Sequence, residues 1–296
     1  MPPAPSQTIG RPKGDAPLPW PKPYDRLFVY YLKGRVPHGA LPDQAAFIGN
    51  WEEAGDSFLF FHTPADAAID ALVQQHPRLV LQDRYDMPYD EWQGEAPAAF
   101  KVGRLQVVPP WDPAAAAATN DTILLDPGVV FGTGTHPTTR DCLTALQAAF
   151  DRRPVNRVFD IGTGTGLLAL AAAKLGARAV AAVDLNRLAT VTARRNVRCN
   201  RMQRRILVVR GDALNFMDRP SDLVVSNIHY DVMRHLIAAP GFSGHRQFIL
   251  SGLLRSQARE IAYRLHRMGA RILGQWEQEG TWFTFHGETG GPSGTG

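Results

Sequence analysis

Residues 158–166 read Val-Phe-Asp-Ile-Gly-Thr-Gly-Thr-Gly, and this stretch decides the fold. A short apolar run enters a turn with three glycines, and a helix is expected to begin directly after it, at Leu167. Glycine is needed at such a turn because the backbone must bend tightly and let a ligand approach where a Cβ atom would stand. The stretch therefore predicts a strand, a turn and a helix with a ligand at the turn. A glycine-lined turn without a ligand is the alternative that this stretch alone leaves open.

Acidic residues around the turn indicate which cofactor it binds. Asp184 ends the next predicted strand, about twenty residues further on, where a carboxylate can accept hydrogen bonds from both ribose hydroxyls. Asp160 precedes the glycines, whose Gly-x-Gly-x-Gly spacing differs from the Gly-x-Gly-x-x-Gly that pyrophosphate favours. S-adenosylmethionine has no pyrophosphate, and its amino group and sulfonium cation suit carboxylates, so the pattern favours it over NAD. Asp212 is expected beside the adenine, or else to cap a turn.

The segments around this turn alternate between strand and helix patterns. Such alternation predicts a mostly parallel sheet with helices on both faces. The last two strands flank a Glu-Gly turn and form a predicted hairpin, and a parallel sheet with an antiparallel end is typical of seven-stranded Rossmann-like methyltransferases. The predicted strands are 155–160, 179–184, 206–210, 222–226, 247–251, 271–276 and 281–285, and the predicted helices are 136–150, 166–176, 186–200, 230–238 and 254–268.

A smaller α+β unit is expected before this domain. Residues 27–32 and 58–61 are rich in strand formers, a helix is predicted after Thr63-Pro64, and 79–81 form another short strand. The next residues form a linker with one strand at 104–108 and an alanine run, 114–118, which is either helical or extended. The expected division is a disordered segment 1–23, a small domain 24–90, a linker 91–118, a methyltransferase domain 119–287 and a disordered tail 288–296.

Composition restricts the class of protein. The 296 residues are 44% hydrophobic and 20% charged, with a net charge of +4, as in an ordinary globular protein that is mildly basic. Two cysteines cannot build a disulfide framework, no metal-ligand spacing is present, and no run of about 18 apolar residues exists. We therefore expect a cytoplasmic protein without metal, signal peptide or membrane span, acting as a monomer.

Residues 125–139 read Leu-Asp-Pro-Gly-Val-Val-Phe-Gly-Thr-Gly-Thr-His-Pro-Thr-Thr, and this run resembles the signature of the PrmA family. Members of that family methylate the stalk-base protein of the ribosome, the eleventh protein of the large subunit. Residues 160–166, 226–228 and 251–258 also resemble the family, and the likeness covers roughly residues 90–286. It implies a protein N-methyltransferase that uses S-adenosylmethionine, acts on lysine or α-amino groups of the stalk-base protein, and docks this substrate on the small domain.

The resemblance also implies that Thr139, Gly162, Asp184 and Asn227 contact the cofactor. The loop before Thr139 has two glycines and could close over the methionine end of the cofactor, although His136 could equally well be a helix-start or packing residue. Asn227 is expected to orient the acceptor nitrogen and is the one catalytic candidate. The candidate cofactor residues are Thr135, His136, Thr139, Asp160, Gly162, Gly164, Gly166, Asp184, Asp212 and Asn227.

Two features keep other functions open. Asn227-Ile228-His229-Tyr230 departs from the family and has the Asn-x-x-Tyr spacing of enzymes that methylate amide or base nitrogens, so the alternative acceptor is a nucleic-acid base or a protein glutamine. Seven arginines in 194–210 could contact RNA, but without interleaved aromatic residues they favour a solvated helix face, so stable nucleic-acid binding is not expected. A non-catalytic binding module is a further alternative, which the intact glycines and Asp184 disfavour.

Overall fold

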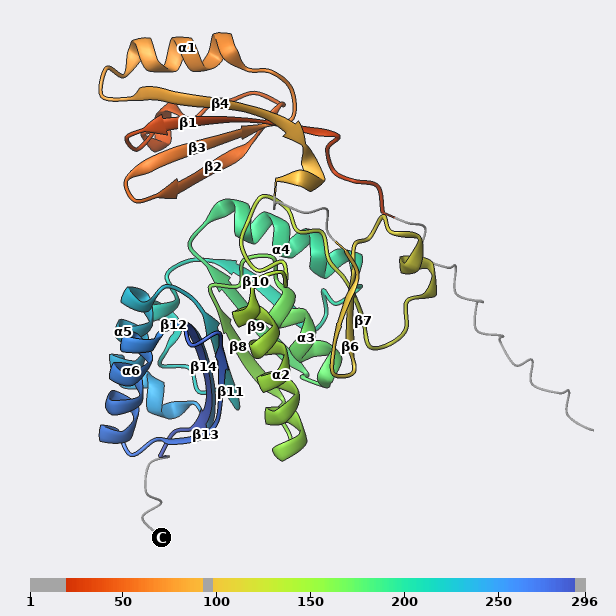
Figure 1. Cartoon of the computed structure of the whole chain (residues 1–296), viewed down its shortest axis with the longest axis vertical. Helices are drawn as coiled ribbons and strands as arrows, with labels where there is room; N and C mark the ends of the chain where they lie inside the picture. Colours follow the sequence, from red (N-terminus) through yellow and green to blue (C-terminus); the bar gives the residue numbers. More distant parts are fainter. Residues whose placement is uncertain (1–19, 93–97, 291–296) are drawn as a thin grey trace, which may run out of the picture.

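The computed structural model describes residues 20–92 and 98–290 (Figure 1). Most of the two segments expected to be disordered, namely 1–19 and 291–296, therefore lies outside the described residues. The last strand runs to Glu288, where the sequence predicted the tail to begin. Within the described parts, no helix is long and apolar enough to cross a membrane.

Seven strands form the central sheet, in the spatial order β10-β9-β8-β11-β12-β14-β13. The first five strands in this order pair in parallel, while β14 is antiparallel to both β12 and β13. This arrangement confirms the predicted fold class. The strands are β8 (Arg157–Ile161), β9 (Ala179–Asp184), β10 (Ile206–Arg210), β11 (Leu223–Asn227), β12 (Gln247–Leu254), β13 (Arg271–Gln278) and β14 (Trp282–Glu288).

Helices cover both faces of this sheet (Figure 1). Alternate strand residues belong to two separate clusters, because successive side chains of a strand point to opposite faces. Val158 packs with α2 (Pro137–Arg152), α3 (Leu167–Leu175) and α4 (Arg187–Cys199). Its neighbour Phe159 packs with α5 (Tyr230–Ala238) and α6 (Arg255–Arg267). The sheet therefore has the two-sided cover that a parallel sheet requires.

One part of the second face is not covered. The connection between β10 and β11, all of it described, contains only the 3-10 turn η4 (Ala213–Phe216) where a full helix would fit. A groove of about 500 Å³ therefore remains over β8, β9 and β10, and Leu207 beside it is 66% exposed. Arg204 and Arg219 line its rim.

The small domain is a four-stranded antiparallel sheet of order β2-β3-β1-β4 with α1 (Asp66–Gln75) on one face (Figure 1). Its strands are β1 (Arg26–Lys33), β2 (Phe47–Glu53), β3 (Asp56–Phe61) and β4 (Val80–Pro88). The sequence predicted β1, β3 and α1, but it missed β2 and all but the start of β4. Both are edge strands, so their partly exposed side chains lack the apolar pattern of buried strands.

A third, three-stranded sheet connects the two domains. It consists of β5 (Phe100–Val102), β6 (Leu105–Val108) and β7 (Thr122–Leu124), whereas the sequence predicted only one strand here. The alanine run forms a 3-10 turn, η3 (Pro113–Ala117), capped by the Asp112 side chain, which accepts from Ala114 N at 2.8 Å. The other 3-10 turns are η1 (His38–Ala40), η2 (Tyr89–Glu91) and η5 (Pro240–Gly244).

The free face of the small sheet packs on the large domain through one apolar cluster. Leu27, Val29 and Phe60 of the small domain meet Val130 and Leu188 of the large one. The contact is close, because a Cβ atom on Gly49 of β2 would lie 2.3 Å from Leu188 Cδ2. The lack of a side chain at residue 49 therefore lets β2 lie against the start of α4.

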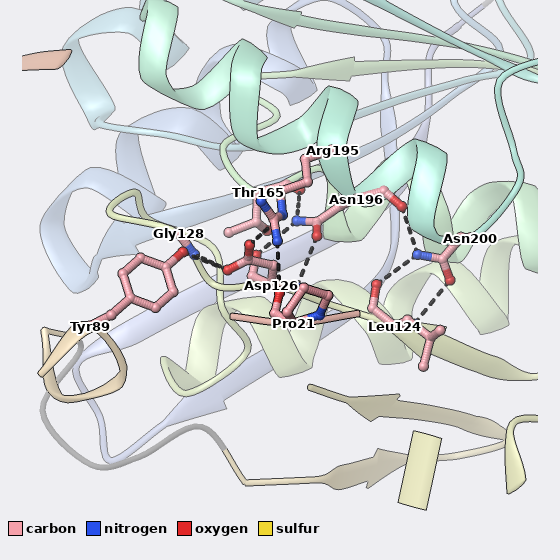
Figure 2. Close-up of polar contacts among 9 residues, drawn as sticks. All are labelled: Pro21, Tyr89, Leu124, Asp126, Gly128, Thr165, Arg195, Asn196 and Asn200. Atoms are coloured by element: carbon pink, nitrogen blue, oxygen red, sulfur yellow. Dashed lines mark hydrogen bonds and ion pairs between the residues drawn. The ribbon is translucent and has the colours of Figure 1, made fainter. Parts of the chain in front are cut away.

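A buried polar network surrounds Asp126, which is 2% exposed (Figure 2). Its carboxylate accepts from the Tyr89 hydroxyl at 2.6 Å and from Gly128 N at 3.0 Å, and it forms an ion pair with Arg195 Nε at 2.9 Å. Asn196 Oδ1 accepts from Asp126 N, and Asn196 Nδ2 donates to Asp126 O and also to Thr165 O, both at 2.8 Å. The loop within residues 125–139 is named the signature loop. One helix, α4, thus fixes this loop, the glycine-rich turn and the end of the small domain.

Replacing Asn196 with Ala is expected to lower the free energy of unfolding by about 2–4 kcal/mol, because it leaves three buried backbone groups without partners. Chemical denaturation measured by circular dichroism checks this value. Arg198→Ala, an exposed change on the same helix, is the control and should cost less than about 0.5 kcal/mol. An equal loss in the two variants would contradict the role of the network.

Candidate functional site

A cavity of about 570 Å³ opens at the carboxyl ends of the parallel strands, the usual ligand position in such sheets. Six of the predicted residues line it, and they come from four separate segments of the chain. These six are His136, Thr139, Gly162, Gly164, Asp184 and Asn227. The four other candidates, Thr135, Asp160, Gly166 and Asp212, are not among the lining residues.

The glycine-rich turn allows contacts that a side chain would block. Gly162 and Gly164 have φ values of 69° and 54°, which favour glycine. A Cβ atom on Gly162 would lie 2.2 Å from Ile228 Cγ2, and one on Gly164 would lie 2.4 Å from Phe131 O. Gly166 has another use, since a Cβ atom there would meet the Cβ of Ala193 on α4 at 3.2 Å. The first two glycines therefore shape the cavity, and the third allows two helices to pack closely.

Asp184, at the end of β9, is held by the backbone of both neighbouring turns. Gly164 N donates to its Oδ2 at 3.0 Å and Asn186 N to its Oδ1 at 2.9 Å. Burial raises the pKa of this carboxyl above its usual value, and the two N–H donors counteract the shift. Each carboxylate oxygen has a second lone pair, so a pair of neighbouring hydroxyls could still donate to it.

Asp160 lies behind the turn and is 1% exposed. Its Oδ2 accepts from Thr163 Oγ1 at 2.6 Å and from Ala169 N at 3.1 Å, while its Oδ1 has no hydrogen-bond partner. Burial raises the pKa of this carboxyl from 3.8 to about 7. The carboxyl therefore connects the turn to α3, and its charge depends on pH near neutrality.

The signature loop reaches the cavity at the start of α2. The His136 side chain caps this helix, since its Nδ1 accepts from Thr138 N at 3.3 Å, and its ring lies 4.9 Å from that of Trp282. Burial lowers the pKa of His136, so its ring is neutral at pH 7. Thr135 is exposed, and within the described part of the chain its side chain bonds to Thr133, with the two hydroxyl oxygens 2.9 Å apart. His136 is thus both a helix cap and part of the cavity wall.

Asn227, the last residue of β11, contacts this loop. Its Nδ2 donates to Thr138 Oγ1 at 3.2 Å and to Thr139 Oγ1 at 3.3 Å. Both amide hydrogens are therefore used, which fixes the orientation of the side chain. Its Oδ1 has no hydrogen-bond partner among the described residues and remains able to accept one.

Two predicted features lie outside the cavity. Asp212 is exposed, and its Oδ1 accepts from Leu214 N at 3.0 Å, so it caps η4 as the alternative interpretation expected. Tyr230 follows Asn227 at the spacing noted in the sequence, but its hydroxyl donates to the Glu260 carboxylate on α6. Asn227 and Tyr230 thus do not form a joint site.

Sequence reasoning missed several residues of the cavity wall. Trp51 and Glu53 belong to β2 of the small domain, and Trp282 begins β14. The only signal for Trp282 was its place directly after the predicted hairpin turn. No signal pointed to Trp51 and Glu53, because β2 itself was not predicted and its position depends on how the domains pack.

The charge of the cavity wall fits a cation. Glu53 and Asp184 supply two carboxylates, and none of the described residues that line the cavity is Lys or Arg, although the chain contains 32 of these. A sulfonium or ammonium group finds no like charge on such a wall, whereas a phosphate finds no cationic partner. Together with Gly162 and Gly164, Asp184 fits S-adenosylmethionine.

A family model described as ribosomal protein L11 methyltransferase (PrmA) matches residues 71–289. The chain belongs to this family. As a PrmA-family member it is a methyltransferase, and its cofactor is S-adenosylmethionine. The resemblance expected from residues 125–139 is thereby confirmed.

Relatives with the same name occur in several bacteria. The chain is 36% identical over 222 residues to the ribosomal protein L11 methyltransferase of Desulfitobacterium hafniense, a match of 73% of this chain and 70% of that protein. The relative from Exiguobacterium sp. is 41% identical, over 57% of this chain and 54% of the relative. The relative from Myxococcus xanthus is 32% identical, over 80% of this chain and 82% of the relative. The matches thus span between about half and four fifths of these relatives.

A solved structure supports the same relationship. The ribosomal protein L11 methylase of Lactobacillus delbrueckii subsp. bulgaricus superposes with a TM-score of 0.56 at 29% sequence identity. The match covers 64% of this chain and 98% of that one.

Replacing Asp160 with Asn should change how stability depends on pH. The pKa of Asp160 lies near 7 in the folded chain and near 3.8 in the unfolded chain. From about pH 4 to 7 this carboxyl is therefore protonated only in the folded wild type, so the free energy of unfolding falls as pH rises through this range. The full effect is roughly 4 kcal/mol and is absent from Asp160→Asn. Denaturant unfolding of both cofactor-free proteins at several pH values tests this. Parallel curves would show that Asp160 does not titrate in this range.

Proposed function

We propose that the chain transfers methyl groups from S-adenosylmethionine to amino nitrogens of ribosomal protein L11, on lysine side chains or the α-amino group. The family name supports this protein as the substrate. The observation that carries the choice of an amino nitrogen is the cavity wall, which has two carboxylates and neither Lys nor Arg. A protonated amine can approach such a wall without meeting a like charge.

We assign the cofactor to the wall formed by β8, β9 and the signature loop. Asp184 would accept the ribose hydroxyls, and the backbone at Gly162 and Gly164 would pass beside the cofactor without side chains in the way. Thr139 would lie along its other side. When bound, the cofactor supplies an electrophilic methyl group on a sulfonium.

Asn227 would position the acceptor. Methyl transfer requires a nitrogen lone pair in line with the bond that breaks, so orientation is the main task of the protein. The Oδ1 of Asn227 can accept one N–H of the amine, while its Nδ2 is held by Thr138 and Thr139. A lysine has a reference pKa of about 10.4 and must first lose a proton, whereas an α-amino group at about 7.7–8.0 loses it readily.

A nucleic-acid base or a glutamine amide has less support as the acceptor. Tyr230, which suggested this alternative, contacts Glu260 and does not line the cavity. A polynucleotide also brings phosphates, and the cavity wall, as far as its residues are described, contains no arginine or lysine to contact them. These two observations favour an amine.

Incubation of the chain with labelled S-adenosylmethionine and unmethylated L11 tests the proposal, with the product measured by intact-protein mass. L11 should gain mass in steps of one methyl group. Asn227→Ala should lower kcat about 10- to 100-fold, because the acceptor nitrogen loses its orientation. Cofactor affinity, measured by calorimetry, should change much less.

Tyr230→Phe serves as the matched control, because this ring lies outside the cavity, and it should keep wild-type turnover. Cofactor binding without any mass gain on L11 would contradict the proposed substrate. Full turnover by Asn227→Ala would contradict the proposed role of Asn227.

A further inference from the structure

β2 of the small domain presents two side chains to the cofactor cavity. Trp51 and Glu53 both line it, as expected for residues two apart on one face of a strand. Glu52, between them, faces the other way, where it lies 3.9 Å from Arg35 Nε and accepts from Asn50 Nδ2 at 3.3 Å. The small domain thus contributes part of the cavity wall.

Glu53 differs from the other carboxylate of this wall. Asp184 is largely buried and accepts two backbone N–H groups, whereas Glu53 is exposed and its side chain has no ion pair or hydrogen bond within the described residues. Because the described part of the wall contains no Lys or Arg, Glu53 has no Lys or Arg partner there. Its carboxylate is therefore free to attract a cation that comes in from solvent.

Trp51 supplies an apolar surface next to this charge. Its side chain is half-buried and packs against the apolar cluster between the two domains, which holds the ring in place. A lysine side chain has the complementary form, since its long aliphatic stem packs on apolar surface while its ammonium stays near a carboxylate or an aromatic ring.

We propose that Trp51 and Glu53 form a subsite for the protonated amine of the methyl acceptor, before the amine reaches Asn227. This inference rests on the proposed function, because it assumes an amine as the acceptor. It assigns the small domain a direct part in acceptor binding at the cavity itself.

The separation of the two tasks has a chemical reason. A carboxylate stabilises the charged form of an amine, and that form has no lone pair with which to attack a methyl group. A carboxylate therefore helps at the entrance and would hinder transfer at the reacting atoms. The neutral amide of Asn227, anchored on Thr138 and Thr139, is suited to the second position.

Glu53→Gln tests the subsite, with Glu52→Gln as the matched control on the opposite face of the strand. With L11 as acceptor, Glu53→Gln should raise KM about 2- to 5-fold and leave kcat and cofactor affinity unchanged, as expected for one exposed ion pair. Glu53→Lys should raise KM further, by about 10-fold, because attraction becomes repulsion. Added salt should raise the KM of the wild type more than that of Glu53→Gln.

Glu52→Gln should behave as the wild type in all these measurements. Equal changes in the two Gln variants would overturn the subsite, since they would show only a general effect of negative charge on the surface. An unchanged KM in Glu53→Gln and Glu53→Lys would overturn it as well.

A binding measurement separates this inference from the proposed function. If the wild type methylates no L11, the proposed function fails by itself, and the subsite is tested with Nα-acetyl-lysine amide in the presence of S-adenosylhomocysteine. This amine should change the tryptophan fluorescence of the wild type, with an affinity about 2- to 5-fold weaker in Glu53→Gln. Equal affinity in wild type and Glu53→Gln would overturn the subsite whatever the true substrate is.

Discussion

The two hydrogen bonds donated by the side-chain amide of Asn196 hold the functional part of this chain together. One goes to Asp126 O in the signature loop and the other to Thr165 O in the glycine-rich turn, each at 2.8 Å. These two segments are separated by almost forty residues, and neither has the regular backbone pairing of a helix or strand at this point. Because Asn196 is fully buried, water cannot replace either bond.

The same connection extends to the small domain. Asn196 fixes the backbone of Asp126, and the carboxylate of Asp126 accepts a hydrogen bond from Tyr89 (Figure 2). Arg195, which directly precedes Asn196 on helix α4, donates to Pro21 O at 3.0 Å. The wall that carries Trp51 and Glu53 therefore has its position set by the helix that also supports the cofactor turn. Above the turn, Thr165 Oγ1 donates to Gly132 O at 2.6 Å, so the loop lies directly on the glycines.

Prediction from the sequence succeeded where local pattern and burial agree. The strands β9 and β10 and the helix α5 have the predicted bounds, because runs of apolar residues and the apolar face of an amphipathic helix are clear local patterns. Gly162, Gly164 and Asp184, which line the cavity, could be named from the sequence because they follow such runs directly. Short strands such as β5 and β7 were missed because three residues are too few for a period.

The missed part of the site has a different cause. Trp51 and Glu53 line the cavity because β2 packs against the large domain, with Gly49 close to Leu188, and this contact joins segments far apart in the sequence. Asp212 is the opposite case. Its place in the sequence suggested a position beside the adenine, but its side chain caps η4. Local patterns identify which residues lie near a turn, but domain packing decides which side chains complete the cavity.

The uncovered groove beside β10 is bordered by two arginines of residues 194–210, Arg204 and Arg205. β10 is the edge strand of the sheet, and with Leu207 exposed it offers both free backbone groups and apolar surface to another molecule of its kind. Arg204, Arg205 and Arg210 are exposed around it, and Arg194 donates to Val208 O at 3.2 Å. Like charges on two such edges repel each other, and long charged side chains hinder strand pairing. The exposed arginines around β10 therefore disfavour edge-to-edge pairing at the strand that borders the uncovered groove.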